Sequence, residues 1–189
     1  MKRYFKIETK RLIIRIINEE DARFMLKLMN TEKWLLNIGD RKVNTEEDAR
    51  RYINSKMGSQ LSAKGFINHI MIDKKKSVAV GTCSIHDREG IEGLDIGYAL
   101  LPEYEGLGYA TEGATMMAQL AFKQFKQQKI SAITKDQNFG SGKVLEKIGF
   151  QHQSYIRLPH EQEDLKFYAL EKKIFEENVK TLADKTYKQ

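Results

Sequence analysis

At 189 residues, with 41% hydrophobic and 31% charged residues, the chain has the composition of one globular domain, which excludes disordered and fibrous classes. The single cysteine, Cys83, excludes an internal disulfide and a cysteine-based zinc site. No stretch approaches the roughly 20 apolar residues of a membrane span, and no apolar segment follows the first charged residues. We therefore expect a cytoplasmic protein that has no membrane partner.

The formal net charge of +6 raises the question of a nucleic-acid partner. Lysines and arginines are spread along the chain, however, and the densest run, Lys74–Lys76, falls in a predicted turn, where solvated lysines are ordinary. The aromatic residues recur at core spacing rather than between basic residues, so we expect no nucleic-acid binding. A basic surface also attracts a phosphate-rich cofactor, so charge alone does not decide the function.

The first half of the chain predicts a strand followed by two helices. Residues Thr9–Ile17 are apolar and β-branched, which indicates a strand. Asn18, followed by three acidic residues, is a typical helix start. A second helix is predicted after Thr45, with an apolar face that extends to Leu61.

The rest of the chain predicts six more strands and two more helices. A long helix follows the predicted strand Gly90–Leu101, and a second helix, Asn138–Lys147, ends at Gly149. The predicted strands are Phe66–Asp73, Ser77–His86, Gly90–Leu101, Lys129–Lys135, Phe150–Leu158 and Asp164–Leu170. We predict one α+β domain over residues 1–172 around a mixed sheet, and a charged tail, 173–189, that forms an exposed helix or a frayed end.

The most informative segment joins a predicted strand to the long helix. It runs from Tyr98 to Glu112 and contains Gly106 and Gly108. A tight glycine turn before a helix directs free backbone N–H groups at one point, where the helix dipole adds partial positive charge. Such a turn suits a pyrophosphate, although an ordinary strand-to-helix turn has the same appearance.

The segment from Asp95 to Glu112 resembles motif A of the GCN5-related N-acetyltransferases (GNAT), most closely the branch of the RimJ and RimL protein N-terminal acetyltransferases. The family signature is glutamine or arginine, two residues, glycine, one residue, then glycine or alanine, and it falls here on residues 105–110. The first position departs from the signature, because it is Glu105. Since backbone N–H groups make most of the family's pyrophosphate contacts, we expect binding to survive and the Glu105 carboxylate to point away.

A second segment supports the resemblance. Residues Asn138–Phe150 resemble the family's next helix, which begins at an asparagine and ends at glycine-phenylalanine. By this resemblance Asn138 holds the pantetheine arm of the cofactor and Ser141 lies near its thiol. Taken by itself, Asn138 is equally compatible with a plain helix cap.

The resemblance implies the GNAT fold, with a mixed and mostly antiparallel sheet of about seven strands, and acetyl-CoA as the donor. The strands Leu94–Leu101 and Lys129–Lys135 are expected to begin parallel and then splay, so that pantetheine docks like an added strand. A backbone N–H near Leu100 would then serve as the oxyanion donor. The expected cofactor-binding residues are Ala99, Leu100, Leu101, Gly106, Leu107, Gly108, Tyr109, Ala110, Thr111, Asn138 and Ser141.

The acceptor amine must lose a proton before it attacks the thioester. Asp95 is the first candidate for the base, because it stands where this branch usually carries a glutamate; the alternative is a carboxylate that only pairs across strands. Glu92 and His86 rank behind it. We expect direct attack without a covalent enzyme intermediate, and a structural role for Cys83.

The leaving thiolate is helped by protonation. The tyrosine that commonly protonates it in the family falls at Leu145, so Ser141 or Tyr168 is expected to replace it. Tyr168 is equally compatible with a core aromatic role.

The acceptor is expected to enter between the first two helices and the closing strands. Trp34, Leu35 and Ile38, in the predicted inter-helix loop, line that groove or simply pack. We expect a protein N-terminus or an amine-bearing small molecule as acceptor, a monomer or homodimer, and no metal, since the four histidines lack ligand spacing. The alternatives are a non-catalytic acyl-CoA-binding regulator of the same fold and a basic nucleic-acid module.

Overall fold

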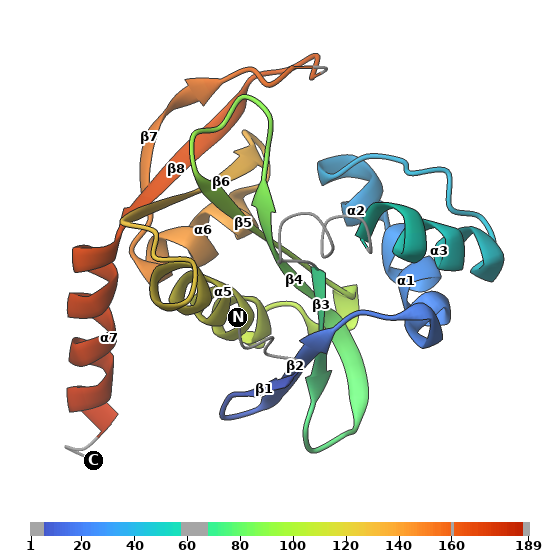
Figure 1. Ribbon diagram of the computed structural model, residues 1–189, viewed down its shortest axis with the longest axis horizontal. Coiled ribbons are helices and arrows are strands. Elements are labelled where there is room, and N and C mark those ends of the chain that lie inside the picture. The colour runs from blue at the N-terminus through green and yellow to red at the C-terminus, as the bar shows by residue number, and fades with distance from the viewer. Residues whose placement is uncertain (1–5, 58–67, 160, 187–189) are drawn as a thin grey trace. The chain divides into compact units, whose positions relative to one another are not determined.

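A computed structural model describes residues 6–57, 68–159 and 161–186 (Figure 1). The fold divides into two compact units, each described in turn. Unit 1 comprises Met1–His86 and Tyr98–Gly113, and unit 2 comprises Asp87–Gly97 and Ala114–Gln189. The boundaries fall inside two strands and one helix.

The strands of unit 1 form antiparallel neighbours. They are β1 (Lys6–Glu8), β2 (Leu12–Ile16), β3 (Asn68–Asp73) and β4 (Val78–Asp87). Ile14 of β2 pairs with Ile7 of β1 on one side and with Met71 of β3 on the other. The pairing of β3 with β4 has a register shift between Met71 and Ile72. The predicted first strand is therefore shorter than expected, and it follows the additional strand β1; Phe66, the expected start of β3, lies outside the described residues.

The helices of unit 1 begin where the sequence predicts. Asn18 caps the 3-10 helix η1 (Glu19–Asp21), which leads into α1 (Ala22–Met29), and Thr45 caps α3 (Glu46–Tyr52). Both starts are capping boxes, in which the cap and the third helical residue satisfy each other's backbone N–H groups. A π-helix, η2 (Ile53–Met57), continues α3. Leu61, at the end of the predicted apolar face, lies outside the described residues.

The segment between the first two predicted helices is itself a helix, so its prediction as a loop was wrong. It forms α2 (Glu32–Asn37), because the Thr31 hydroxyl accepts a hydrogen bond from the Trp34 N–H and caps a turn too short to show apolar periodicity. Trp34 is only 8% exposed and joins a hydrophobic cluster built from α1, α2 and α3. Leu35 and Ile38 are exposed. Of the two roles considered for Trp34, its burial supports packing.

Unit 2 contains the parallel part of the sheet. The start of β5 (Leu94–Leu100) runs parallel to β6 (Lys129–Lys135), with Leu94 opposite Ile130 and Asp95 opposite Ser131. Strand β6 pairs antiparallel with β8 (Leu165–Glu171), which pairs with β7 (Gln151–Ile156). This confirms the expected parallel start of β5 and β6; their splay beyond it stays a prediction.

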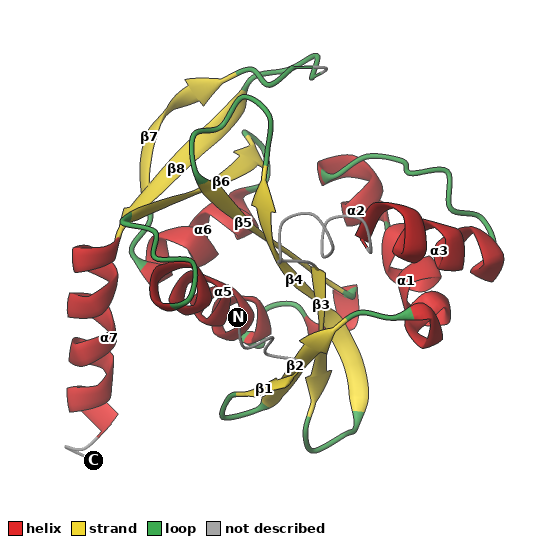
Figure 2. Ribbon diagram, in the orientation of Figure 1, coloured by secondary structure: helices red, strands yellow, loops and turns green. Residues whose placement is uncertain are grey.

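Three of the described helices lie wholly or partly in unit 2 (Figure 2). They are α5 (Tyr109–Lys123), which begins in unit 1, α6 (Phe139–Ile148) and α7 (Lys172–Thr186). Helix α6 has the predicted Asn138 cap and ends at Gly149, whose φ of 111° is the left-handed conformation that glycine adopts without strain. The charged tail forms α7, and its Phe175 is buried against Phe122 with ring centroids 5.3 Å apart.

The strand order is β1-β2-β3-β4-β5-β6-β8-β7 in one eight-stranded sheet. In the described residues this is the expected α+β architecture with a mixed sheet, and it has one strand more than the seven or so expected, because the sequence pattern does not indicate β1. None of the helices in the described residues combines the length and the apolar character needed to cross a membrane.

Candidate functional site

The predicted phosphate turn has the backbone that such a turn requires. A 3-10 helix, η3 (Pro102–Tyr104), leads into a turn over residues 105–108, and α5 begins at Tyr109. Gly106 has φ 70° and Gly108 has φ 83°, which are left-handed conformations that residues with a Cβ adopt only with strain. The turn therefore opens directly onto the first N–H groups of α5, which have no carbonyl of the same helix to bond.

The side chain of Arg11 contacts this turn, although no local sequence pattern indicates such a role. Its Nη1 donates to the carbonyl oxygen of Leu107 at 2.7 Å, and its Nε donates to a carboxylate oxygen of Glu112 at 2.7 Å. The guanidinium also lies 4.6 Å from the centroid of the Tyr109 ring. The Leu107 carbonyl oxygen, which by itself would repel an anion, is therefore bonded to a cation.

Glu112 is the second anchor of the turn. It accepts hydrogen bonds from the Thr9 hydroxyl and from the backbone N–H of Arg11, in addition to the guanidinium bond. Burial alone would raise the pKa of the Glu112 carboxyl, but the bonds from Thr9 and Arg11 and the Arg11 charge outweigh it and hold this pKa below its ordinary value. The start of β2 is thereby tied to the first turn of α5.

Tyr109 is fixed by a third contact. Its hydroxyl donates to a carboxylate oxygen of Asp73 at the end of β3, and both side chains are buried. This hydrogen bond is the main reason that the Tyr109 pKa is raised and the Asp73 pKa is lowered. Tyr109, expected to contact the cofactor, therefore presents its backbone to the turn while its side chain anchors the helix.

Glu105, the residue that departs from the family signature, forms an ion pair with Lys33 of α2. The expectation was that this carboxylate points away from a bound pyrophosphate. Its pairing with a lysine of another helix gives a physical reason for such an orientation, since a compact ammonium offsets the negative charge.

The end of β5, residues Ala99–Leu101, was expected to offer a free edge to pantetheine. The Leu101 N–H is already donated to the Val80 carbonyl at 3.0 Å, and the Leu101 carbonyl oxygen already accepts from the Tyr104 N–H at 2.9 Å, so both backbone groups of this residue have a partner within the protein. A Cβ added to Gly81 would lie 2.3 Å from the Ala99 carbonyl oxygen, so glycine at 81 permits the close approach of these backbones. The docking role of Ala99 and Leu100 stays a prediction.

Asp95, the first candidate for the base, is 1% exposed and lies in unit 2. Its carboxylate is paired with Arg88, at 3.1 Å from Nη2. Of the weaker candidates, Glu92 is exposed, and His86 Nε2 lies 2.7 Å from the Ser84 hydroxyl. The pairing with Arg88 is compatible with both alternatives for Asp95, a base and a carboxylate with a purely structural role.

The remaining predicted residues, Asn138, Ser141 and Tyr168, come together at the start of α6. The Asn138 side chain accepts a hydrogen bond from the Ser141 N–H at 3.2 Å. Asn138 and Tyr168 line the same cavity of about 180 Å³, whose other lining residues are Phe139, Gly142, Lys143, Glu146 and Lys166.

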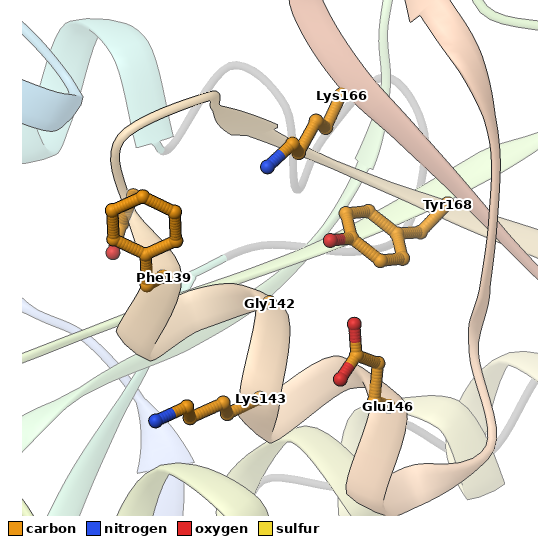
Figure 3. A pocket seen from close by; sticks show the side chains of 7 residues that line it. Phe139, Gly142, Lys143, Glu146, Lys166 and Tyr168 are labelled. Atoms are coloured by element: carbon orange, nitrogen blue, oxygen red, sulfur yellow. The ribbon is translucent and has the colours of Figure 1, made fainter.

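Figure 3 shows Lys166 and Tyr168 extending from β8 toward α6, while Lys143 points away from Tyr168. A Cβ added to Gly142 would lie 2.9 Å from the Tyr168 hydroxyl oxygen, so glycine makes room for the ring. Burial, and then the negative charge of Glu146, raise the Tyr168 pKa. The hydroxyl therefore keeps its proton at neutral pH and can donate a hydrogen bond.

The structure thus sorts the predicted residues into two groups. Residues 99–101 and 106–111 belong to unit 1, and Asp95, Asn138, Ser141 and Tyr168 belong to unit 2. In the described parts of the chain, no group of three or more histidine, cysteine, aspartate or glutamate side chains could hold a metal ion. Cys83 is fully buried, and burial raises the pKa of its thiol, so it is not a nucleophile.

Comparison with protein families matches residues 11–151 to the acetyltransferase (GNAT) domain. Among curated proteins, the chain is similar to the uncharacterized N-acetyltransferase YnaD of Bacillus subtilis (strain 168). The two are 27% identical over 151 residues, which cover 80% of this chain and 85% of that protein.

Solved structures show the same fold. The acetyltransferase (GNAT family) from Bacillus anthracis matches with a TM-score of 0.74 and 29% identity, covering 89% of this chain and 99% of that chain. The spermidine N-acetyltransferase from Vibrio cholerae, solved in complex with CoA and spermine, matches with a TM-score of 0.72 and 14% identity, covering 88% and 99%. At that identity the likeness concerns the fold alone.

Proposed function

The chain belongs to the acetyltransferase (GNAT) domain family, and from this we propose that it transfers an acetyl group from acetyl-CoA to a primary amine. The turn over residues 105–108 carries the proposal. It combines two left-handed glycines with a helix N-terminus, which is an arrangement suited to a pyrophosphate, and Arg11 engages the carbonyl oxygen of Leu107 within the turn.

In this proposal each residue has the cofactor-binding role that the family resemblance implies. The backbone N–H groups of residues 106–111 bind the pyrophosphate, whereas Asn138 and Ser141 bind the pantetheine arm. Ala99 and Leu100 add backbone hydrogen bonds. The acceptor is an amine-bearing small molecule or a protein N-terminus, in keeping with the resemblance to the RimJ/RimL branch and with relatives named N-acetyltransferases.

The acceptor amine attacks the thioester carbonyl directly, and the C–S bond breaks as the CoA thiolate leaves. Asp95 takes the amine proton, directly or through a water, and the Arg88 guanidinium lies beside its carboxylate. Tyr168 or Ser141 assists the departure of the thiolate. Since the pKa of Tyr168 is raised, its hydroxyl acts by donating a hydrogen bond rather than by giving up its proton.

The decisive experiment is a panel of amines scored by release of the CoA thiol. The purified protein is incubated with acetyl-CoA and a polyamine, an aminoglycoside or a peptide with a free N-terminus, with a no-amine control. Thiol release that depends on one class of amine supports the proposal and identifies the acceptor. If acetyl-CoA binds but no amine releases thiol, the chain is a non-catalytic acyl-CoA-binding protein.

Cofactor binding is tested separately by protection against heat. Gly108→Trp should abolish the protection given by acetyl-CoA, because a side chain strains the left-handed backbone at 108 and its Cβ would lie 3.2 Å from the Arg11 guanidinium, which distorts the turn. Gly39→Trp is the matched control: Gly39 also has a left-handed backbone, with φ 98°, and a Cβ there would meet nothing within 4 Å. Equal protection of the two variants, or no binding of CoA to the unchanged protein at millimolar concentration, contradicts the proposed function.

A further inference from the structure

Lys33 and Glu105 bring together two segments that are 72 residues apart in the sequence. Lys33 lies in α2, and Glu105 is the first residue of the glycine turn, so the pair joins a helix of the α1–α3 cluster to the edge of the proposed phosphate site. The side chain of Glu105 is 30% exposed and that of Lys33 is 61% exposed. Both partners belong to unit 1.

The backbone on both sides of this pair is fixed. The Glu105 N–H is donated to the Pro102 carbonyl, and Glu105 has extended φ and ψ of −72° and 158°, so only its side-chain torsions are free. Helix α2 is held by the buried Trp34 next to Lys33 and by the Thr31 cap. The backbone of Lys33 is therefore held in place, and the ion pair favours conformations in which the Glu105 carboxylate points toward Lys33.

The negative charge of Glu105 would weaken CoA binding at this turn if nothing offset it. It is one residue away from Gly106, and a pyrophosphate carries two negative charges, so an unpaired carboxylate turned toward the site repels the ligand. Arg11 does not offset it, because its guanidinium is occupied by Leu107 and Glu112.

We propose that Lys33 is a positioning residue for cofactor binding, which holds the Glu105 carboxylate away from the phosphate groups of CoA and neutralises it. This inference rests on the proposed function and deepens it. It makes α2 a determinant of cofactor affinity, although α2 lies far from the glycine turn in the sequence. Its role concerns binding and not the chemical step.

The test compares CoA affinity by calorimetry across Lys33→Gln, Glu105→Gln and the double variant. We expect Lys33→Gln to raise the Kd about three- to fivefold, in the range of exposed charge pairs. The loss should shrink at high salt, since salt screens the repulsion. In the Glu105→Gln background the same lysine change should have no effect, because no carboxylate is left to hold.

The chain offers a matched control in the neighbouring pair of Lys27 and Glu103, whose Nζ and Oε1 lie 2.6 Å apart. This pair joins α1 to η3 with similar exposure but lies farther from the turn. Lys27→Gln should therefore change the Kd less than twofold. In turnover assays, Lys33→Gln should raise the KM for acetyl-CoA and leave kcat unchanged.

Three results would overturn the inference. They are an unchanged Kd in Lys33→Gln, a loss that persists in the Glu105→Gln background, and an equal loss in Lys27→Gln. In each of these cases the unchanged protein still binds CoA, so the proposed function stands. Failure of the unchanged protein to bind CoA would overturn both together.

Discussion

Replacing Arg11 by glutamine removes the side chain that holds the glycine turn from outside. The change deletes the bond to the Leu107 carbonyl, the ion pair with the part-buried Glu112 and the contact with the Tyr109 ring. The bonds from Thr9 and from the residue 11 backbone to Glu112 remain. The effect should therefore be a loosened turn in a protein that still folds.

The structure gives the size of the effect. The lost hydrogen bond to Leu107 contributes about 1 kcal/mol. The ion pair contributes about another 1 kcal/mol, a value kept low because the Arg11 side chain is 40% exposed. The unfolding free energy should then fall by about 2 kcal/mol, which lowers the Tm by roughly 4–8 °C for a chain of this size. We expect the Kd for acetyl-CoA to rise about fivefold, equivalent to about 1 kcal/mol.

Arg15→Gln is the matched control. Arg15 lies on β2, just after Arg11 in the sequence, and makes two 2.7 Å bonds to the carboxylate of the buried Asp21 in η1. Its replacement should lower the Tm by a similar amount without changing the Kd for acetyl-CoA. Thermal unfolding and calorimetry are measured on both variants. If the two lose the same stability and bind acetyl-CoA equally well, Arg11 does not order the cofactor turn and the reasoning is refuted.

Three further predictions concern the turn, the candidate base and pH. Gly108→Ala should destabilise the protein more than Gly106→Ala. Both changes strain a left-handed backbone by about 1–2 kcal/mol, but only the Cβ at 108 meets the Arg11 guanidinium, at 3.2 Å. Equal Tm values of the two variants would contradict this prediction. Asp95→Asn should lower kcat more than it raises the KM for acetyl-CoA. If Asp95→Asn and Arg88→Gln instead lower the Tm equally and leave kcat unchanged, the ion pair has a structural role. Because the folded-state pKa of Glu112 is lowered, its contribution to stability is complete above the unfolded value of about 4.3 and is lost as the pH falls through the folded value. Unfolding experiments should therefore show an acid-induced loss below about pH 4 that is smaller in Glu112→Gln; an equal loss in that variant would mean that another group is responsible.

Local features of the chain were readable from the sequence because they depend on neighbouring residues. The caps at Asn18, Thr45 and Asn138 satisfy N–H groups only a few residues away, and the left-handed glycines at 106, 108 and 149 are where the turn and helix-end patterns predict them. The motif from Asp95 to Glu112 likewise identified the family, since it lies in one continuous segment. Helix α2 was missed because six residues are too few to show a helical period.

Only the tertiary structure decided which distant side chains contact the glycine turn over residues 105–108 and the start of α5. Arg11 and Thr9 meet Glu112 about a hundred residues later, and Lys33 meets Glu105 across 72 residues, so no local pattern reveals either contact. The burial of Asp95, which is 1% exposed and pairs with Ser131 of β6, also depends on the fold, although its partner Arg88 is only seven residues away in the sequence. A sequence states which groups are present, but the charge that each one meets depends on the fold that brings its partners within a few ångströms.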